Sequence, residues 1–275
     1  MAMDPMHFRK YLATDEAQQG ADYVRRLANG PLDVFVVLGS GLAEVLAPWG
    51  DPLAHCALSD IPGVIAPVAD GHEDRFLVYR RPVAVGPGSV TVGVACGRTH
   101  LYEGHGPDAV THLSKVVALA GAGVAIVCNS NGCLRDWDLG DVVAIEDHAN
   151  LSGTSPFSGT VFLDVATVWD DEFTDVLTQH VQRRGNYAML RGPEYQTRLE
   201  SRMLRAAGVD CVGMSTVLEA ITLHAFGVRV CGLSVVSDLS FAVAPTDPGA
   251  VLEAAAAAQP VVRRGIEAVL AAVSP

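Results

Sequence analysis

Basic side chains are scarce in this chain, where Lys and Arg number 19 against 31 Asp and Glu, for a formal net charge of −12. A surface that binds nucleic acid places a basic face against the phosphate backbone. The composition therefore argues against nucleic acid as a partner. It does not exclude one small phosphate ion, because a few local donors can overcome the field of the whole protein.

Long apolar runs are also missing, and no stretch reaches the length of about 20 residues that a membrane-spanning helix requires. Residues 1–7 lack the charged-then-apolar pattern of a signal peptide, and we expect them to be disordered or to come from an expression tag. The six cysteines form no CxxC pair and mostly lie in apolar runs. Free, buried thiols in a reducing compartment are the simplest interpretation, so we expect a cytoplasmic protein without a membrane partner.

Short β-branched runs alternate with helical periodicity along the 275 residues, of which 49% are hydrophobic. The strands are predicted at residues 33–38, 76–85, 89–96, 124–128, 142–146, 187–190, 209–213 and 228–236. The helices are predicted from residue 42 and at 108–120, 171–184, 197–207, 216–225 and 248–273, with a kink at Pro260. This alternation predicts a single α/β domain over residues 1–275, with a mixed, largely parallel central sheet flanked by helices.

Two connections stand out between these elements. A Gly-Pro-Gly turn is predicted at residues 86–88, between two adjacent strands. The longest irregular segment is predicted at residues 147–167, and loops of that length are usually functional or interfacial.

The segment Leu38-Gly-Ser-Gly-Leu42 follows a predicted strand and opens a predicted helix. Backbone donors at such a turn, together with the Ser40 hydroxyl, can bind an anion. A tight strand-to-helix turn without a ligand explains the same residues equally well, since the full GxGxxG pattern is missing.

A second polar segment, Gly97-Arg-Thr-His-Leu-Tyr-Glu-Gly104, follows the strand at residues 89–96. If it continues that strand, Arg98, His100 and Tyr102 point to the same face. An Arg fork beside a His and a Tyr suits an oxyanion. Three convergent donors favour a site over an exposed polar strand end.

Polar residues also follow two buried strands, in Cys128-Asn-Ser-Asn-Gly132 and in Val236-Ser-Asp238. The carboxyl ends of strands are where α/β sheets bind ligands, although an acid such as Asp238 can also cap the next segment. Acidic residues gather between residues 136 and 147, namely Asp136, Asp138, Asp141, Glu146 and Asp147. Their spacing does not match that of a calcium-binding loop, so we interpret the segment as a solvated loop and expect no metal site.

Taken together, the motifs resemble the trimeric purine nucleoside phosphorylases. They are LGSGL, GRTHLYEGH, GDVVAIEDHANLSGTSP, RGPEYQTRLESRML, GVDCVGMSTVLEA and GVRVCGLSVVSD, in order from about Val34 to Asp238. The resemblance implies a phosphorylase/hydrolase-like fold and a homotrimer. It implies phosphorolysis of purine nucleosides to a free base and a pentose 1-phosphate, with inorganic phosphate as co-substrate and no metal or organic cofactor.

The resemblance also assigns roles to individual residues. The phosphate-binding residues would be Ser40, His72, Arg98, His100, Ser130 and Ser215. The nucleoside-binding residues would be Tyr102 and Met214 at the pentose, Tyr195 at the base, Phe162 lent by a neighbouring subunit, and Gln196 and Asp238 at the purine. The groups expected to act in catalysis are His100, Gln196 and Asp238.

Two departures from the family pattern fall on the purine contacts. Members that act on 6-oxopurines typically have Glu in place of Gln196 and Asn in place of Asp238. Gln196 can donate to N1 of adenine, and Asp238 can accept from its 6-amino group. The sequence therefore suggests acceptance of 6-aminopurine nucleosides, although Gln196 can also meet a 6-oxopurine through its carbonyl oxygen.

A third departure concerns the 5′ end of the nucleoside. Residues 245–252 contain no His, a residue that often reaches the 5′-hydroxyl in this family, and Val251 or Leu252 would tolerate a 5′-methylthio group. Methylthioadenosine phosphorylase is therefore the closest alternative activity. Ser215 argues against this alternative, because methylthioadenosine phosphorylases tend to have Thr at that position. A non-catalytic nucleoside-binding relative remains a further alternative, whereas a nicotinamide-dependent oxidoreductase would rest on Gly39-Ser-Gly41 alone.

Overall fold

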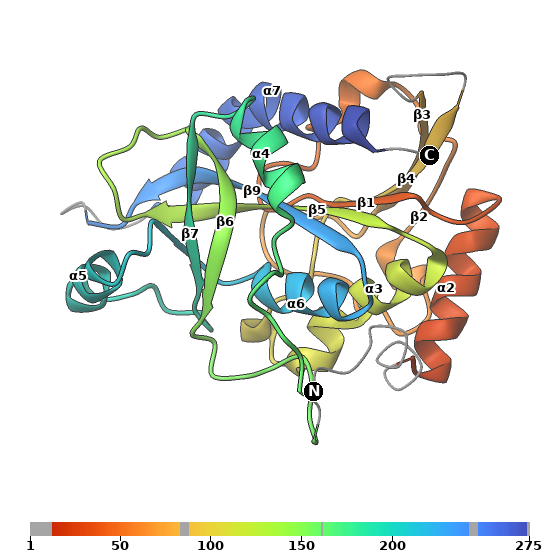
Figure 1. Cartoon of the computed structure of the whole chain (residues 1–275), viewed down its shortest axis with the longest axis horizontal. Coiled ribbons are helices and arrows are strands. Elements are labelled where there is room, and N and C mark those ends of the chain that lie inside the picture. Colours follow the sequence, from red (N-terminus) through yellow and green to blue (C-terminus); the bar gives the residue numbers. More distant parts are fainter. Residues whose placement is uncertain (1–12, 83–87, 161, 242–246, 274–275) are drawn as a thin grey trace.

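The computed structural model describes residues 13–82, 88–160, 162–241 and 247–273. Within them, one mixed sheet lies between two layers of helices, which gives a single α/β domain as predicted (Figure 1). Residues 1–7, residues 86 and 87 of the predicted turn, and the start of the 245–252 stretch lie outside the described residues.

Nine strands are described, and most follow the predicted runs. They are β1 (Val34–Val37), β2 (Ala54–Cys56), β3 (Phe76–Pro82), β4 (Ser89–Ala95), β5 (Val124–Cys133), β6 (Val142–Asn150), β7 (Arg183–Met189), β8 (Cys211–Gly213) and β9 (Arg229–Leu239). The α-helices of the described residues are α2 (Asp15–Ala28), α3 (Gly106–Ala120), α4 (Asp171–Thr178), α5 (Arg198–Ala206), α6 (Val217–Ala225) and α7 (Pro248–Ala272). Short 3₁₀ turns are η1 (Ala47–Trp49), η2 (Leu58–Asp60) and η3 (Leu101–Glu103).

The sheet combines an open half with a closed one. Its order is β2-β3-β4-β1-β5-β8-β7-β6-β9, and β9 also pairs with β5, so the last five strands form a ring. Strands β4, β1, β5 and β9 are mutually parallel along their shared ladders. Their carboxyl ends therefore meet at one edge, where ligands bind in such sheets.

Each face of the sheet packs against its own helices. The buried side chains of α2, α3 and α6 join one hydrophobic cluster, and those of α4 and α7 join another on the opposite face. In Figure 1, α4 and α7 lie above the sheet and α3 and α6 below it. The apolar strand runs, buried on both faces, explain why the sequence shows so little alternation in them.

The helix predicted from Leu42 is wrong. The backbone after β1 forms successive i→i+3 turns, in which Leu42 N donates to Gly39 O and Val45 N to Leu42 O, each at 3.0 Å. It then enters η1, where Pro48 has no N–H to donate to a continuing α-helical ladder. Consequently no helix dipole supports an anion at Ser40.

Other boundaries differ in informative ways. The helix predicted at 171–184 ends at Thr178, because β7 already begins at Arg183. Strands β5, β6 and β9 run past their predicted polar ends, since pairing with neighbouring strands carries the ladder on. Helix α2, which was not predicted, starts after Thr14, whose side chain accepts from Ala17 N at 3.2 Å.

Candidate active site

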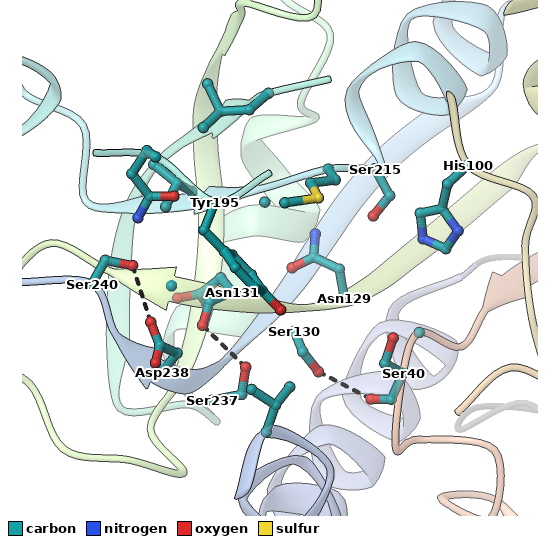
Figure 2. Close-up of a pocket in the computed structure, with 18 of the residues that line it drawn as sticks. Ser40, His100, Asn129, Ser130, Asn131, Tyr195, Ser215, Ser237, Asp238 and Ser240 are labelled. Atoms are coloured by element: carbon teal, nitrogen blue, oxygen red, sulfur yellow. Dashed lines mark hydrogen bonds between the residues drawn. The ribbon is translucent and has the colours of Figure 1, made fainter. Parts of the chain in front are cut away.

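A cavity of about 140 Å³ lies where β1, β5, β8 and β9 end. Every residue that the sequence assigned to a ligand lines it, except Arg98 and Phe162. Figure 2 shows Ser40, His100 and Ser215 at one end, Asp238 and Ser240 at the other, and Tyr195 between them. The cavity therefore has an end rich in donors and an end with a carboxylate.

His72 and Ser40 form a pair at the donor-rich end. The backbone N–H of Arg98 donates to His72 Nδ1 at 3.2 Å, so the neutral ring carries its hydrogen on Nε2 and donates it to Ser40 Oγ at 3.0 Å. Burial, followed by the proximity of His100 and Arg98, lowers the pKa of His72 to about 2. The Ser40 hydroxyl is left free to donate its own hydrogen to an anion.

His100 is held in place by Glu103. The Glu103 carboxylate accepts from the backbone N–H of His100 at 2.8 Å and lies 3.1 Å from its Nδ1. Burial raises the pKa of Glu103, but the hydrogen bonds from His100 and from the Val68 N–H outweigh it, and the net pKa is lowered. An ionised Glu103 therefore orients the imidazole and leaves Nε2 available to the cavity.

His100 and Tyr102 come together for a reason that differs from the predicted one. Strand β4 ends at Ala95, and Tyr102 lies in η3, so the strand alternation proposed for Arg98, His100 and Tyr102 is wrong. The 3₁₀ turn instead stacks the two rings, with centroids 4.7 Å apart and planes at 14°. The His72 ring lies against the His100 ring in a T-shaped arrangement, with centroids 4.8 Å apart.

Arg98 is buried behind the cavity and does not line it. Its Nη1 donates to Thr216 Oγ1 at 2.9 Å and to Ser215 Oγ at 3.1 Å, and its Nη2 donates to Cys128 O at 2.6 Å. Glu219 lies 3.5 Å from Nη1 and balances the charge. In this arrangement the guanidinium fixes Ser215, rather than presenting its fork to a ligand.

Thr216 is one of two non-glycine residues in the described chain with a positive φ, at 81°. It is buried, and its N–H donates to Glu219 Oε2 at 3.0 Å at the start of α6. A threonine in this conformation is strained by an amount on the order of 1–3 kcal/mol, and such strain gathers at functional sites. Here it turns the chain so that Ser215 and Met214 both reach the cavity.

A β-bulge shapes the opposite end. The β5–β9 register pairs Asn131 with Val236 and Gly132 with Asp238, which leaves Ser237 as an extra residue. The extra residue Ser237 and its neighbour Asp238 both line the cavity. Ser240 Oγ donates to Asp238 Oδ2 at 3.3 Å.

Sequence reasoning did not assign ligand roles to Asn131, Ser237 or Ser240, although all three line the cavity. The available signal was their position at the ends of β5 and β9, beside residues that were chosen. Phe162 is 78% exposed and lies outside the cavity of its own chain. At the 5′ side, Val251 lines the cavity and Leu252 does not.

Three of the five acidic residues considered for a metal form ion pairs with arginines. Asp141 contacts Arg183 at 2.7 Å, Glu146 contacts Arg184 at 2.6 Å and Asp136 contacts Arg205 at 3.4 Å. In the part of the chain that the structure describes, no group of His, Cys, Asp or Glu is arranged to hold a metal ion. A search of the same residues finds no helix with the length and apolarity needed to span a bilayer.

This fold and cavity define an α/β protein with a polar cavity at the ends of its parallel strands. Residues 35–273 match the family described as the phosphorylase superfamily, and the chain belongs to that family. The membership of a phosphorylase family that the sequence motifs predicted is thereby confirmed.

Named relatives are similar over most of their length. Purine nucleoside phosphorylase of Mycobacterium tuberculosis is 38% identical over 259 residues, covering 92% of this chain and 93% of the relative. The protein of that name from Cellulomonas sp is 37% identical, covering 83% of this chain and 82% of the relative. A crystal structure of isoform 2 of purine nucleoside phosphorylase from Schistosoma mansoni, in complex with cytosine and ribose-1-phosphate, has a TM-score of 0.83 at 24% identity and covers 94% of this chain and 97% of its own. At that identity the likeness concerns the fold.

Proposed function

We propose that the protein is a purine nucleoside phosphorylase, which uses inorganic phosphate to split a purine nucleoside into free base and pentose 1-phosphate. The observation that carries the proposal is the two-ended cavity. Hydroxyl and imidazole groups of Ser40, His100 and Ser215 gather at one end, and Gln196 and Asp238 line the same cavity with the acid at the other end. The relatives at 37–38% identity carry this name.

The proposed reaction matches the chemistry of each end. Breaking the glycosidic bond builds positive charge on the sugar and negative charge on the departing base. A phosphate dianion held by Ser40, His100 and Ser215, with His72 and Ser130 lining the same end of the cavity, stabilises the sugar cation and attacks its anomeric carbon, while Gln196 and Asp238 stabilise the leaving purine. Phosphate is the co-substrate, and the proposal requires no metal or organic cofactor.

In this scheme Arg98 supports the phosphate site through Ser215. It donates to Ser215 Oγ at 3.1 Å and adds a positive charge behind that hydroxyl. Tyr195 lies between the two ends (Figure 2), and Tyr102, whose ring stacks on His100, lines the same cavity with Met214. These three residues would contact the pentose and the base.

We further propose that 6-aminopurine nucleosides are accepted. Asp238 presents an acceptor for an exocyclic amino group, and Gln196 can donate to N1. The apolar Val251 wall supports the alternative that a 5′-methylthio nucleoside fits the same cavity. A non-catalytic relative would have no use for the ordered donors around Ser40 and His100.

The remaining proposals concern domain organisation, cellular localisation and oligomeric state. We propose that residues 1–275 form one nucleoside phosphorylase domain, that the protein acts in the cytoplasm, and that three copies associate. Support for association comes from exposed large apolar side chains. Leu151, Tyr195 and Met203 line a hollow that shares Tyr195 with the cavity, and Phe162 is exposed elsewhere on the surface. Phe162 would then cover the pentose of a neighbouring copy.

The test is a phosphorolysis screen of inosine, guanosine, adenosine and methylthioadenosine, with and without phosphate. We expect phosphate-dependent release of base, with adenosine among the substrates. The double variant Gln196→Glu, Asp238→Asn should move activity toward inosine and guanosine. Absence of base release from all four nucleosides would reject the proposed function, and light scattering of the purified protein tests the trimer separately.

A further inference from the structure

Asn131 carries the most informative unsatisfied group in the cavity. The residue lines the cavity and is only 3% exposed. Among the described residues, its Oδ1 atom has no hydrogen-bond partner. A buried carbonyl without a partner costs about 1–3 kcal/mol, so a native protein that keeps one at a ligand cavity has a use for it.

The orientation of this amide follows from its neighbours. Asn131 Nδ2 donates to Ser234 Oγ at 2.7 Å, and Ser234 Oγ donates its one hydrogen to Asn129 Oδ1 at 2.5 Å. Asn129 Nδ2 donates in turn to Thr216 Oγ1 at 2.8 Å. Because the Ser234 hydrogen is already committed, Ser234 must accept from Asn131, and Asn131 Oδ1 is left over as the acceptor.

Asn131 lies near Asp238 at this end of the cavity. Gly132, the residue after Asn131, pairs with Asp238 across the β5–β9 ladder, and Asn131 and Asp238 both line the cavity. In Figure 2 they lie next to each other at the end opposite Ser40. Two neighbouring acceptors complement an amino group, which has two N–H donors, and they repel a carbonyl oxygen.

Resting on the proposed function, we propose that Asn131 is a specificity-determining residue that, with Asp238, selects nucleosides whose purine carries a 6-amino group. Asn131 Oδ1 accepts one N–H of that group and Asp238 the other. Ser234 is a positioning residue, since it acts only by holding the Asn131 amide in this orientation. With the amide reversed, Nδ2 would face the cavity and would favour a 6-oxo group instead.

The experiment compares kcat/KM for adenosine, inosine and guanosine in the wild type, Asn131→Ala and Asn131→Asp. Loss of one neutral hydrogen bond predicts that Asn131→Ala lowers the adenosine-to-inosine ratio about tenfold, with the KM for phosphate within about twofold of wild type. Asn131→Asp keeps an acceptor and should retain the preference better than Asn131→Ala. Calorimetric binding of adenine and hypoxanthine provides a second measurement that does not need turnover.

Ser234→Ala is the second variant, which keeps Asn131 but frees its amide to turn. It should lower the same ratio by a smaller factor than Asn131→Ala does. The inference is overturned if Asn131→Ala slows adenosine and inosine equally, if it affects guanosine instead of adenosine, or if the adenine-to-hypoxanthine affinity ratio does not change. These results differ from failure of the proposed function, in which the wild type itself releases no base.

Discussion

His72 offers a quantitative test of the donor-rich end of the cavity, because its ring is held neutral. Burial, with the nearby His100 and Arg98, lowers its pKa to about 2, and its neutral form makes hydrogen bonds through both ring nitrogens. We therefore expect folding stability to depend on pH through this residue. The perturbation is a change of pH combined with the substitution His72→Gln.

The magnitude follows from the two pKa values. In the unfolded chain a histidine has a pKa of about 6.5. Below pH 6.5 the unfolded state therefore binds a proton, whereas His72 in the folded state stays neutral. The contribution is fully present above pH 6.5 and is lost as the pH falls toward the folded pKa of about 2. A full pH unit corresponds to about 1.4 kcal/mol once the unfolded histidine is protonated, and at about pH 6.5 it is half protonated. The free energy of unfolding should therefore lose about 2.3 kcal/mol through this group between pH 6.5 and 4.5.

The assay is urea unfolding of wild type and His72→Gln at pH 6.5, 5.5 and 4.5, in buffer without phosphate and at one protein concentration. His112 and His148, whose pKa values are also lowered chiefly by burial, remain in both proteins and cancel in the difference. His180→Gln, at an exposed position after α4, is the matched control for loss of a histidine. Parallel pH profiles for wild type and His72→Gln would refute the reasoning.

Two further predictions concern backbone geometry. A Cβ atom at Gly39 would lie 2.8 Å from Asn129 Cα and 2.9 Å from Cys128 O. Gly39→Ala should therefore lower the free energy of unfolding by about 1–3 kcal/mol and raise the KM for phosphate. An unchanged KM would contradict the placement of the β1 end beside β5. Asn29 ends α2 in the left-handed conformation, with φ 52° and ψ 44°. Asn29→Ala should therefore lower the free energy of unfolding in urea by about 1 kcal/mol, whereas Asn29→Gly should not. Equal losses in both variants would show that the left-handed cap is unimportant.

Much of the architecture was predictable because local patterns are consistent with it. The buried runs that form β1, β4, β5 and β9 are continuous and β-branched, as expected for parallel strands covered on both faces. Helix α2 was missed because its sequence is largely polar, with an apolar stripe made mainly of alanines, and because its N-cap Thr14 is a weak signal by itself. The helix expected from Leu42 failed because glycine and proline permit several turn types, which local sequence does not distinguish.

The sequence by itself determined the family and selected Ser40, His100, Ser215, Gln196 and Asp238, which all line one cavity, because motif chemistry is carried by residue type and order. Only the tertiary structure decided where the side chains point. The bulge at Ser237, the burial of Arg98 behind Ser215 and the open acceptor of Asn131 depend on pairings and packing between residues about 100 positions apart. The direction of a side chain follows from register and neighbours, and these exist only once distant strands have met.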